Sequence, residues 1–253
     1  MIALEMAMQD AEGVRIARQI GAARVELTQA LALGGLTPSP ATLERAVEEA
    51  GESGPEIHVL IRCRAGGFCY DRDELETMRR DVRAAVSRGA KGVVIGALDA
   101  EGRLDADALA GLRDAAEGAS VTLHRAIDVT PDPVAALPTA RALGLRRVLT
   151  SGGASAAIDG IDTLRALVAA ADGIEIMAGG GVTAANAALL AATGIDAVHF
   201  SAKRTVSAAP HGVRMGSAAD GADGHEVTDP DEAAAIRDAL AGVSSSAVVD
   251  RVV

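Results

Sequence analysis

Short apolar runs alternate along the chain with longer segments whose apolar residues recur every three or four positions. The short runs stand at 2–6, 24–27, 57–62, 92–96, 121–124, 147–150, 174–177 and 197–200. A segment with helical periodicity follows each run; after the first, Asp10 is a suitable N-cap and Val14, Ala17 and Ile20 share one helix face. The pattern therefore predicts eight strand-and-helix pairs.

The spacing of these pairs indicates the fold class. Strand starts are about 28 residues apart, close to the minimum for a strand and its crossover helix. Eight such units in 253 residues match an α/β protein with a (β/α)₈ TIM barrel. A doubly wound open sheet has the same local pattern and stays as the alternative, although its edge strands should be more polar.

No shift in composition divides the chain before residue 205. We therefore expect one barrel domain over residues 1–253, with a helix from Thr183 to Ala192 after the seventh strand. Between about 205 and 228 the residues are mostly small and polar, which predicts a long loop before the last helix.

Polar residues gather where the predicted strands end. In a barrel, side chains at the C-terminal ends of strands form the active site, whereas the other end serves stability. The residues at these ends are Glu5, Glu26, Arg62, Arg64, His124, Arg125, His199 and Ser201. We expect Glu5, Glu26, Arg62, His124 and His199 to converge at one mouth.

Two interpretations of this cluster remain open. Buried charges are costly unless they are paired, so Glu5 and Glu26 could simply neutralise Arg62 in a structural ion-pair network. Alternatively, the cluster is a polar catalytic pocket in which Arg62 holds an anionic group and Glu5, Glu26 or His124 moves a proton. Two histidines at one end of the barrel favour the catalytic interpretation.

Glycine-rich loops after the late strands predict an anion site. Gly179, Gly180 and Gly181 precede a predicted helix start, where backbone N–H groups attract anions. Ser201 and Lys203 follow the eighth strand and Ser151 follows the sixth, adding hydroxyl donors and a positive charge. These loops commonly form the phosphate site of TIM barrels.

The composition of the chain limits the kinds of partner that it is expected to bind. The chain has 24 basic and 35 acidic residues, a formal charge of −11, and only three aromatic side chains, which disfavours nucleic acid. No uncharged apolar run reaches transmembrane length, and acidic residues stand near the N-terminus where a signal peptide would be basic. A cytoplasmic protein is expected, and a homo-oligomer remains an alternative to a monomer.

The two cysteines have two possible roles. Cys63 and Cys69 could meet across a loop and bind a soft monovalent metal, or they could be free thiols in a reducing compartment. Without two further ligands at suitable spacing, a structural zinc site is disfavoured.

Several motifs taken together resemble a known family. They are Val25–Leu27 with Leu33–Ser39, Ile61–Arg64 with Gly66–Phe68 and Tyr70, Thr122–Asp128, Leu149–Gly152, Gly179–Val182 with Asn186, and His199–Ser201. In this order they resemble the CutC-type copper homeostasis proteins over nearly the whole chain. The resemblance implies a cytoplasmic TIM barrel linked to copper, with a pocket of Glu5, Glu26, Arg62, Arg64, His124, Asp128, His199 and Ser201.

The sequence also departs from that family. Cysteines often follow the first two strand-end glutamates of family members by two residues, and here Ala7 and Thr28 stand at those positions. Cys63 replaces a proline between the two arginines. Because thiolates are the natural ligands of Cu(I), a site reduced to Met6, Met8 and displaced cysteines should bind copper weakly.

Two functions therefore compete. The resemblance implies a copper-binding homeostasis protein. The pocket instead predicts an enzyme that acts on a small anionic molecule by acid/base chemistry, and we expect that molecule to be phosphorylated. A scaffold that acts through its acidic surface has the least support in the sequence.

Overall fold

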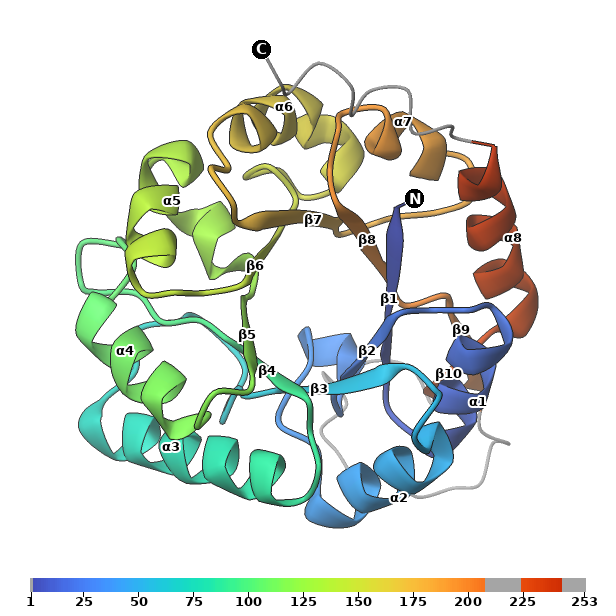
Figure 1. Cartoon of the computed structure of the whole chain (residues 1–253), viewed down its shortest axis with the longest axis horizontal. Helices are drawn as coiled ribbons and strands as arrows, with labels where there is room; N and C mark the ends of the chain where they lie inside the picture. The colour runs from blue at the N-terminus through green and yellow to red at the C-terminus, as the bar shows by residue number, and fades with distance from the viewer. Residues whose placement is uncertain (1, 208–223, 243–253) are drawn as a thin grey trace.

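The computed structural model describes residues 2–207 and 224–242. Eight parallel strands form a closed barrel in sequence order, and helices surround it as an outer ring (Figure 1). Strand β1 (Ala3–Met8) pairs with β8 (Ala197–Phe200) in the register Glu5↔His199, which closes the sheet. This closure confirms the predicted barrel and rules out the open doubly wound sheet.

The other strands and helices lie close to their predicted positions. The remaining barrel strands are β2 (Arg24–Leu27), β3 (Glu56–Leu60), β4 (Gly92–Ile95), β5 (Ser120–Leu123), β6 (Arg147–Thr150) and β7 (Glu175–Gly179). The helices are α1 (Ala11–Gln19), α2 (Pro40–Ala50), α3 (Arg72–Ser87), α4 (Ala106–Ala115), α5 (Pro133–Ala142), α6 (Ile161–Ala169), α7 (Ala187–Ala191) and α8 (Pro230–Ala241).

Local signals set the helix boundaries. Asp10 caps α1 by accepting a hydrogen bond from the Gly13 N–H, and Asp71 forms a capping box with Glu74 at α3. Proline occupies the first turn of α2, α5 and α8, where its missing N–H costs no hydrogen bond. These caps explain why helix starts could be predicted from the sequence.

Two predicted elements differ from the structure. Helix α7 begins at Ala187 rather than Thr183, because the side chain of Asn186 accepts from the Thr183 N–H and donates to the Gly181 carbonyl, which holds this segment as a turn. Of the loop predicted at 205–228, residues 208–223 lie outside the described residues. The segments on either side of these residues form an antiparallel pair of strands, β9 (Lys203–Ser207) and β10 (Gly224–Thr228).

Side chains alternate between two environments along each strand. Leu4, Met6 and Met8 of β1 pack outward against the helices, in the main apolar core. The other face of each strand points into the barrel, where polar residues replace much of the usual aliphatic filling: Glu5, Arg24, Glu26, His58, Thr122, Arg147 and His199. The apolar cluster inside the barrel is small, with Leu149, Met177 and Ala197.

Candidate functional site at the barrel mouth

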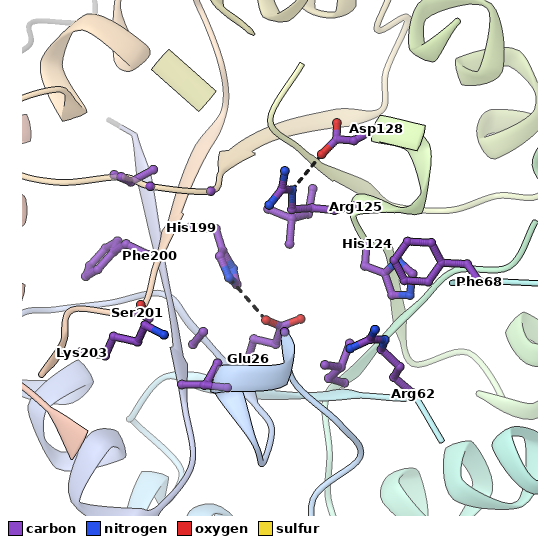
Figure 2. Close-up of a pocket in the computed structure, with 18 of the residues that line it drawn as sticks. Glu26, Arg62, Phe68, His124, Arg125, Asp128, His199, Phe200, Ser201 and Lys203 are labelled. Atoms are coloured by element: carbon purple, nitrogen blue, oxygen red, sulfur yellow. Dashed lines mark hydrogen bonds and ion pairs between the residues drawn. The ribbon is translucent and has the colours of Figure 1, made fainter. Parts of the chain in front are cut away.

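The C-terminal ends of the strands surround a cavity of about 540 Å³ (Figure 2). The charged and aromatic residues that line it are Glu26, Arg62, Phe68, His124, Arg125, Asp128, His199, Phe200 and Lys203. Of the five residues expected to converge at the mouth, four line this cavity, and Glu5 does not.

Glu5 lies below the cavity, fully buried inside the barrel. Strand β1 continues to Met8, so Glu5 is in the middle of the strand and not at its end. One carboxylate oxygen accepts from Nε of Arg24 at 2.9 Å, and the other lies 2.9 Å from Nδ1 of His199. The ion-pair partner of Glu5 is therefore Arg24 and not Arg62, a correction to the structural interpretation considered above.

These contacts keep Glu5 ionised. Burial alone would raise the pKa of the carboxyl, but the hydrogen bond with His199 and the charges of His199 and Arg24 outweigh burial and lower the pKa to about 2. Arg24 was not identified as a site residue from the sequence, although Arg24 and Glu26 lie on the same inward face of β2. Residues two positions apart on a strand point to the same side, so the position of Glu26 could have identified Arg24 as an inward-facing residue.

Glu26 and His199 form the titratable pair of the cavity. Oε2 of Glu26 lies 3.3 Å from Nε2 of His199, as the dashed line in Figure 2 marks. Burial raises the pKa of Glu26 to about 7, with a further rise from the charge of Glu5 and an opposing effect from His199. Burial acts to lower the pKa of His199, but Glu26 and Glu5 raise it above its usual value. Near neutral pH, this pair can both accept and donate a proton.

Arg62 reaches the cavity from the segment after β3. Its Nη1 donates to the carbonyl oxygens of Leu33 and Gly35, both at 2.9 Å, and Nη2 donates to that of Gly66 at 2.8 Å. The residue is 7% exposed. No carboxylate of residues 2–207 or 224–242 forms an ion pair with it. Arg62 thus brings to the cavity one positive charge that no carboxylate of the described residues compensates.

His124 is held as a neutral hydrogen-bond donor. The backbone N–H of Ala126 donates to Nδ1 at 3.0 Å, so Nδ1 carries no proton and the imidazole proton is on Nε2. Burial and the nearby Arg62 lower the pKa of His124 to about 3. This geometry favours a fixed donor rather than the proton carrier that the sequence led us to consider.

Asp128 ties two loops of the mouth together. Its carboxylate accepts from the backbone N–H of Ser151 at 2.9 Å, from that of Gly153 at 3.1 Å and from Nε of Arg125 at 2.8 Å. The hydroxyl of Ser151 also contacts Asp128 and accepts from Arg125. Asp128 therefore occupies the donors of the β6 loop that we expected to serve an external anion.

The glycine loop after β7 lies against Arg125. A β-carbon on Gly180 would be 3.1 Å from Nη1 of Arg125, a tight contact, and the φ of +104° would strain any other residue at this position. Gly180 and Gly181 line the cavity. However, five residues separate Gly181 from the start of α7, so these glycines do not lie at a helix N-terminus.

The other residues predicted to bind an anion differ in whether they reach the cavity. Ser201 and Lys203 line the cavity, but Nζ of Lys203 is paired with Glu226 of β10. Arg64 forms an ion pair with Glu74 of α3 and lies over the Tyr70 ring, with 4.9 Å between Cζ and the ring centroid. The structure therefore does not bring Arg64 into the cavity with Arg62.

Copper ligands do not gather in the described part of the chain. Cys63 is partly buried, and the thiol of the exposed Cys69 contacts the Asp99 carbonyl oxygen at 3.1 Å. Met6 and Met8 are fully buried among the apolar residues outside the barrel. Thr28 uses its hydroxyl to contact the Leu36 carbonyl oxygen at 2.8 Å. Within residues 2–207 and 224–242, no group of three His, Cys, Asp or Glu side chains could hold a metal ion.

None of the helices within residues 2–207 and 224–242 combines the length and the hydropathy needed to cross a bilayer.

Comparison with known proteins gives consistent matches. The model of the CutC family matches residues 2–204. A family protein CutC from Xanthomonas campestris pv. campestris (strain B100) is 48% identical over 210 residues, which cover 82% of this chain and 86% of that protein. One from Photobacterium profundum is 44% identical over 206 residues, covering 81% and 83% of the two chains.

Solved structures agree with these matches. A crystal structure provisionally described as the copper homeostasis protein CutC from Streptococcus agalactiae has a TM-score of 0.75 and 34% identity, covering 79% of this chain and 98% of that one. Thiamine phosphate pyrophosphorylase from Pyrococcus furiosus has a TM-score of 0.60 at 16% identity, covers 96% of each chain and shares the fold alone.

Proposed function

The chain belongs to the CutC family, and from the geometry of its barrel mouth we propose that it is an enzyme that binds a small anionic organic molecule and moves a proton on it through Glu26 and His199. The proposal locates this activity in the cytoplasm, where free thiols such as those of Cys63 and Cys69 are usual.

The observation that carries the proposal is the Glu26–His199 pair. A pKa of about 7 places Glu26 near the optimum for general acid/base catalysis at neutral pH. The pair faces a cavity large enough for a small metabolite, and perturbed titratable groups in such cavities are typical of active sites. A purely structural network would not require Glu26 to be close to its titration point.

Glu5 and Arg24 support the pair from below. The ionised Glu5 orients His199 through Nδ1 and stabilises its positive charge. His199 then presents Nε2 to Glu26. In the proposed step, the Glu26 carboxylate accepts a proton from a substrate carbon next to a carbonyl group, and the electron pair of the broken C–H bond moves onto the carbonyl oxygen. The reverse transfer returns the proton.

Copper handling is the second candidate, because the similar protein from Streptococcus agalactiae is described as a copper homeostasis protein. The residues of this chain do not fit a Cu(I) site well. Thiolates are absent at positions 7 and 28, and the hydroxyl of Thr28 is bonded to a backbone oxygen. We therefore rank copper binding below the acid/base function.

Deuterium incorporation from D₂O tests the proposal. Pyruvate and dihydroxyacetone phosphate are suitable probes, because each is a small anion with an acidic C–H next to a carbonyl. We expect the protein to exchange that hydrogen in at least one probe, followed by ¹H NMR. Glu26→Gln should slow the exchange by about 100-fold or more. Glu48→Gln, on the exposed face of α2, is the control and should leave it unchanged.

Two results would contradict the proposal. One is the absence of exchange in both probes with the unaltered protein. The other is exchange in Glu26→Gln at the rate of the unaltered protein, which would place the base elsewhere.

A further inference from the structure

Three buried hydrogen-bond donors without partners occur together beside the cavity. Among the described residues, four buried side-chain nitrogen or oxygen atoms have no hydrogen-bond partner, and three of them are Nε of Arg62, Nε2 of His124 and the hydroxyl of Tyr70. Leaving one buried polar group unsatisfied costs about 1–3 kcal/mol, so a cluster of three needs an explanation.

Contacts through Phe68 and Arg62 join these side chains into one corner. The ring centroids of Phe68 and His124 are 4.7 Å apart, and Cζ of Arg62 lies 5.6 Å from the centroid of Phe68. Figure 2 shows Arg62, Phe68 and His124 on the same side of the cavity. Burial raises the pKa of the Tyr70 hydroxyl, and the nearby guanidinium of Arg62 partly offsets this rise.

The charge of this corner is also unbalanced. The other two buried arginines of the described chain have carboxylate partners, Arg24 with Glu5 and Arg147 with Glu175. Arg62 has no carboxylate partner among the described residues: its guanidinium donates to backbone carbonyls and lies next to the Tyr70 hydroxyl. A buried charge without a counter-ion is strongly unfavourable, so an anion from outside the protein would stabilise this arrangement.

The available donors define the kind of anion. Carbonyl oxygens accept from three of the five N–H groups of Arg62, which leaves Nε–H and one N–H of Nη2, and the neutral His124 adds a further N–H. These donors carry a single positive charge, which matches the single negative charge of a carboxylate, and N–H groups from a guanidinium bind carboxylate oxygens well. A dianionic phosphoryl group would leave one negative charge uncompensated.

We propose that the corner formed by Arg62, Phe68 and His124 is a subsite for the carboxylate group of a small organic acid. This inference rests on the proposed function, because it specifies the anionic group of that substrate. With its carboxylate at Arg62, the rest of the molecule extends across the cavity toward Glu26 and His199. The residues of the subsite come from the segments that follow β3 and β5, and not from the glycine loop after β7.

Binding of simple anions tests the subsite without requiring catalysis. Acetate and pyruvate should raise the thermal midpoint in a saturable manner, and should shift the Nε2 resonance of His124 in ¹⁵N-edited NMR. Inorganic phosphate and chloride at equal ionic strength should do neither. The readout is the apparent Kd of each anion for the full chain.

One variant removes a donor and retains the local structure. His124→Asn keeps an acceptor for the Ala126 N–H, since asparagine is a good N-cap, but it has no counterpart of Nε2. We expect its affinity for acetate to fall by about tenfold or more. Arg165→Gln is the control, because it also removes a positive charge, but from the exposed face of α6, where Arg165 is paired with Asp162; its acetate affinity should not change.

Three outcomes would overturn the subsite. They are unchanged acetate affinity in His124→Asn, an equal loss of affinity in Arg165→Gln, or a response to phosphate or chloride equal to that to acetate. The proposed function fails separately, through the exchange experiment with Glu26→Gln, because that variant retains Arg62 and His124.

Discussion

The imidazole of His124 occupies the space next to Gly96 where any larger residue would place its side chain. A β-carbon on Gly96 would lie 2.2 Å from Cε1 of His124. Four residues earlier, at the start of β4, a β-carbon on Gly92 would lie 2.6 Å from Cε1 of His58. Each glycine thus makes room for one buried histidine, but only His124 lines the cavity.

This arrangement predicts different effects of two similar substitutions. Gly96→Ala should force His124 to move, which should lower the free energy of unfolding by about 1–3 kcal/mol and weaken acetate binding. Gly92→Ala should destabilise the protein to a similar extent through His58 but leave acetate binding intact. Urea unfolding and acetate titration measure both effects. Equal acetate affinity in the two variants would contradict the role given to His124.

Glu5→Gln should affect both stability and the titration of His199. Removing the carboxylate leaves Arg24 buried without a counter-ion, and we expect a loss of about 3–5 kcal/mol in the free energy of unfolding. It should also lower the pKa of His199, because Glu5 is one of the groups that raise it. Glu56→Gln, at an exposed carboxylate beside His58, is the control. An unchanged His199 titration by NMR would show that Glu5 does not govern it.

His124 should make stability depend on pH in the acid range. Its pKa is about 3 in the folded protein and near 6.5 in the unfolded chain. Between these values the unfolded chain holds a proton that the folded protein lacks, so stability rises with pH by up to about 1.4 kcal/mol per pH unit and is complete above pH 6.5. The slope should be smaller in His124→Asn. Parallel stability curves for the two proteins would disprove this contribution.

Copper binding should be weak. Titration against a competing Cu(I) chelator should show no tight stoichiometric site, because Ala7 and Thr28 replace two candidate thiolate ligands and Cys69 is exposed. Tight binding that Cys63→Ser abolishes, with Cys69→Ser as the comparison, would instead show that the displaced cysteine has become a ligand.

The sequence predicted the barrel because its evidence is local. Strand and helix alternation, aspartate N-caps and prolines in first turns all act within a few residues of one another. The same periodicity placed Glu26, Arg62, His124 and His199 near strand ends, and these four line one cavity. The motifs that resemble the CutC family agree with the family match over residues 2–204.

The ion-pair partner of each charged residue could not be predicted from this local evidence. Glu5 pairs with Arg24 across adjacent strands because their residues share a register in the closed sheet. Arg64 was expected in the pocket beside Arg62, yet it turns outward to Glu74 because the chain leaves strand geometry after Leu60 and the two-residue alternation no longer applies.

The sequence by itself determined the elements, their order, the closed barrel that they favour and the end at which polar groups gather, since these follow from short-range periodicity. Only the tertiary structure decided which groups remain available for a ligand. Asp128 accepts from the donors of the β6 loop and Glu226 pairs with Lys203, whereas Nε of Arg62 and Nε2 of His124 have no hydrogen-bond partner in the described chain. Hydrogen bonds and ion pairs form between residues far apart in sequence, so their satisfaction depends on distances that only the folded chain defines.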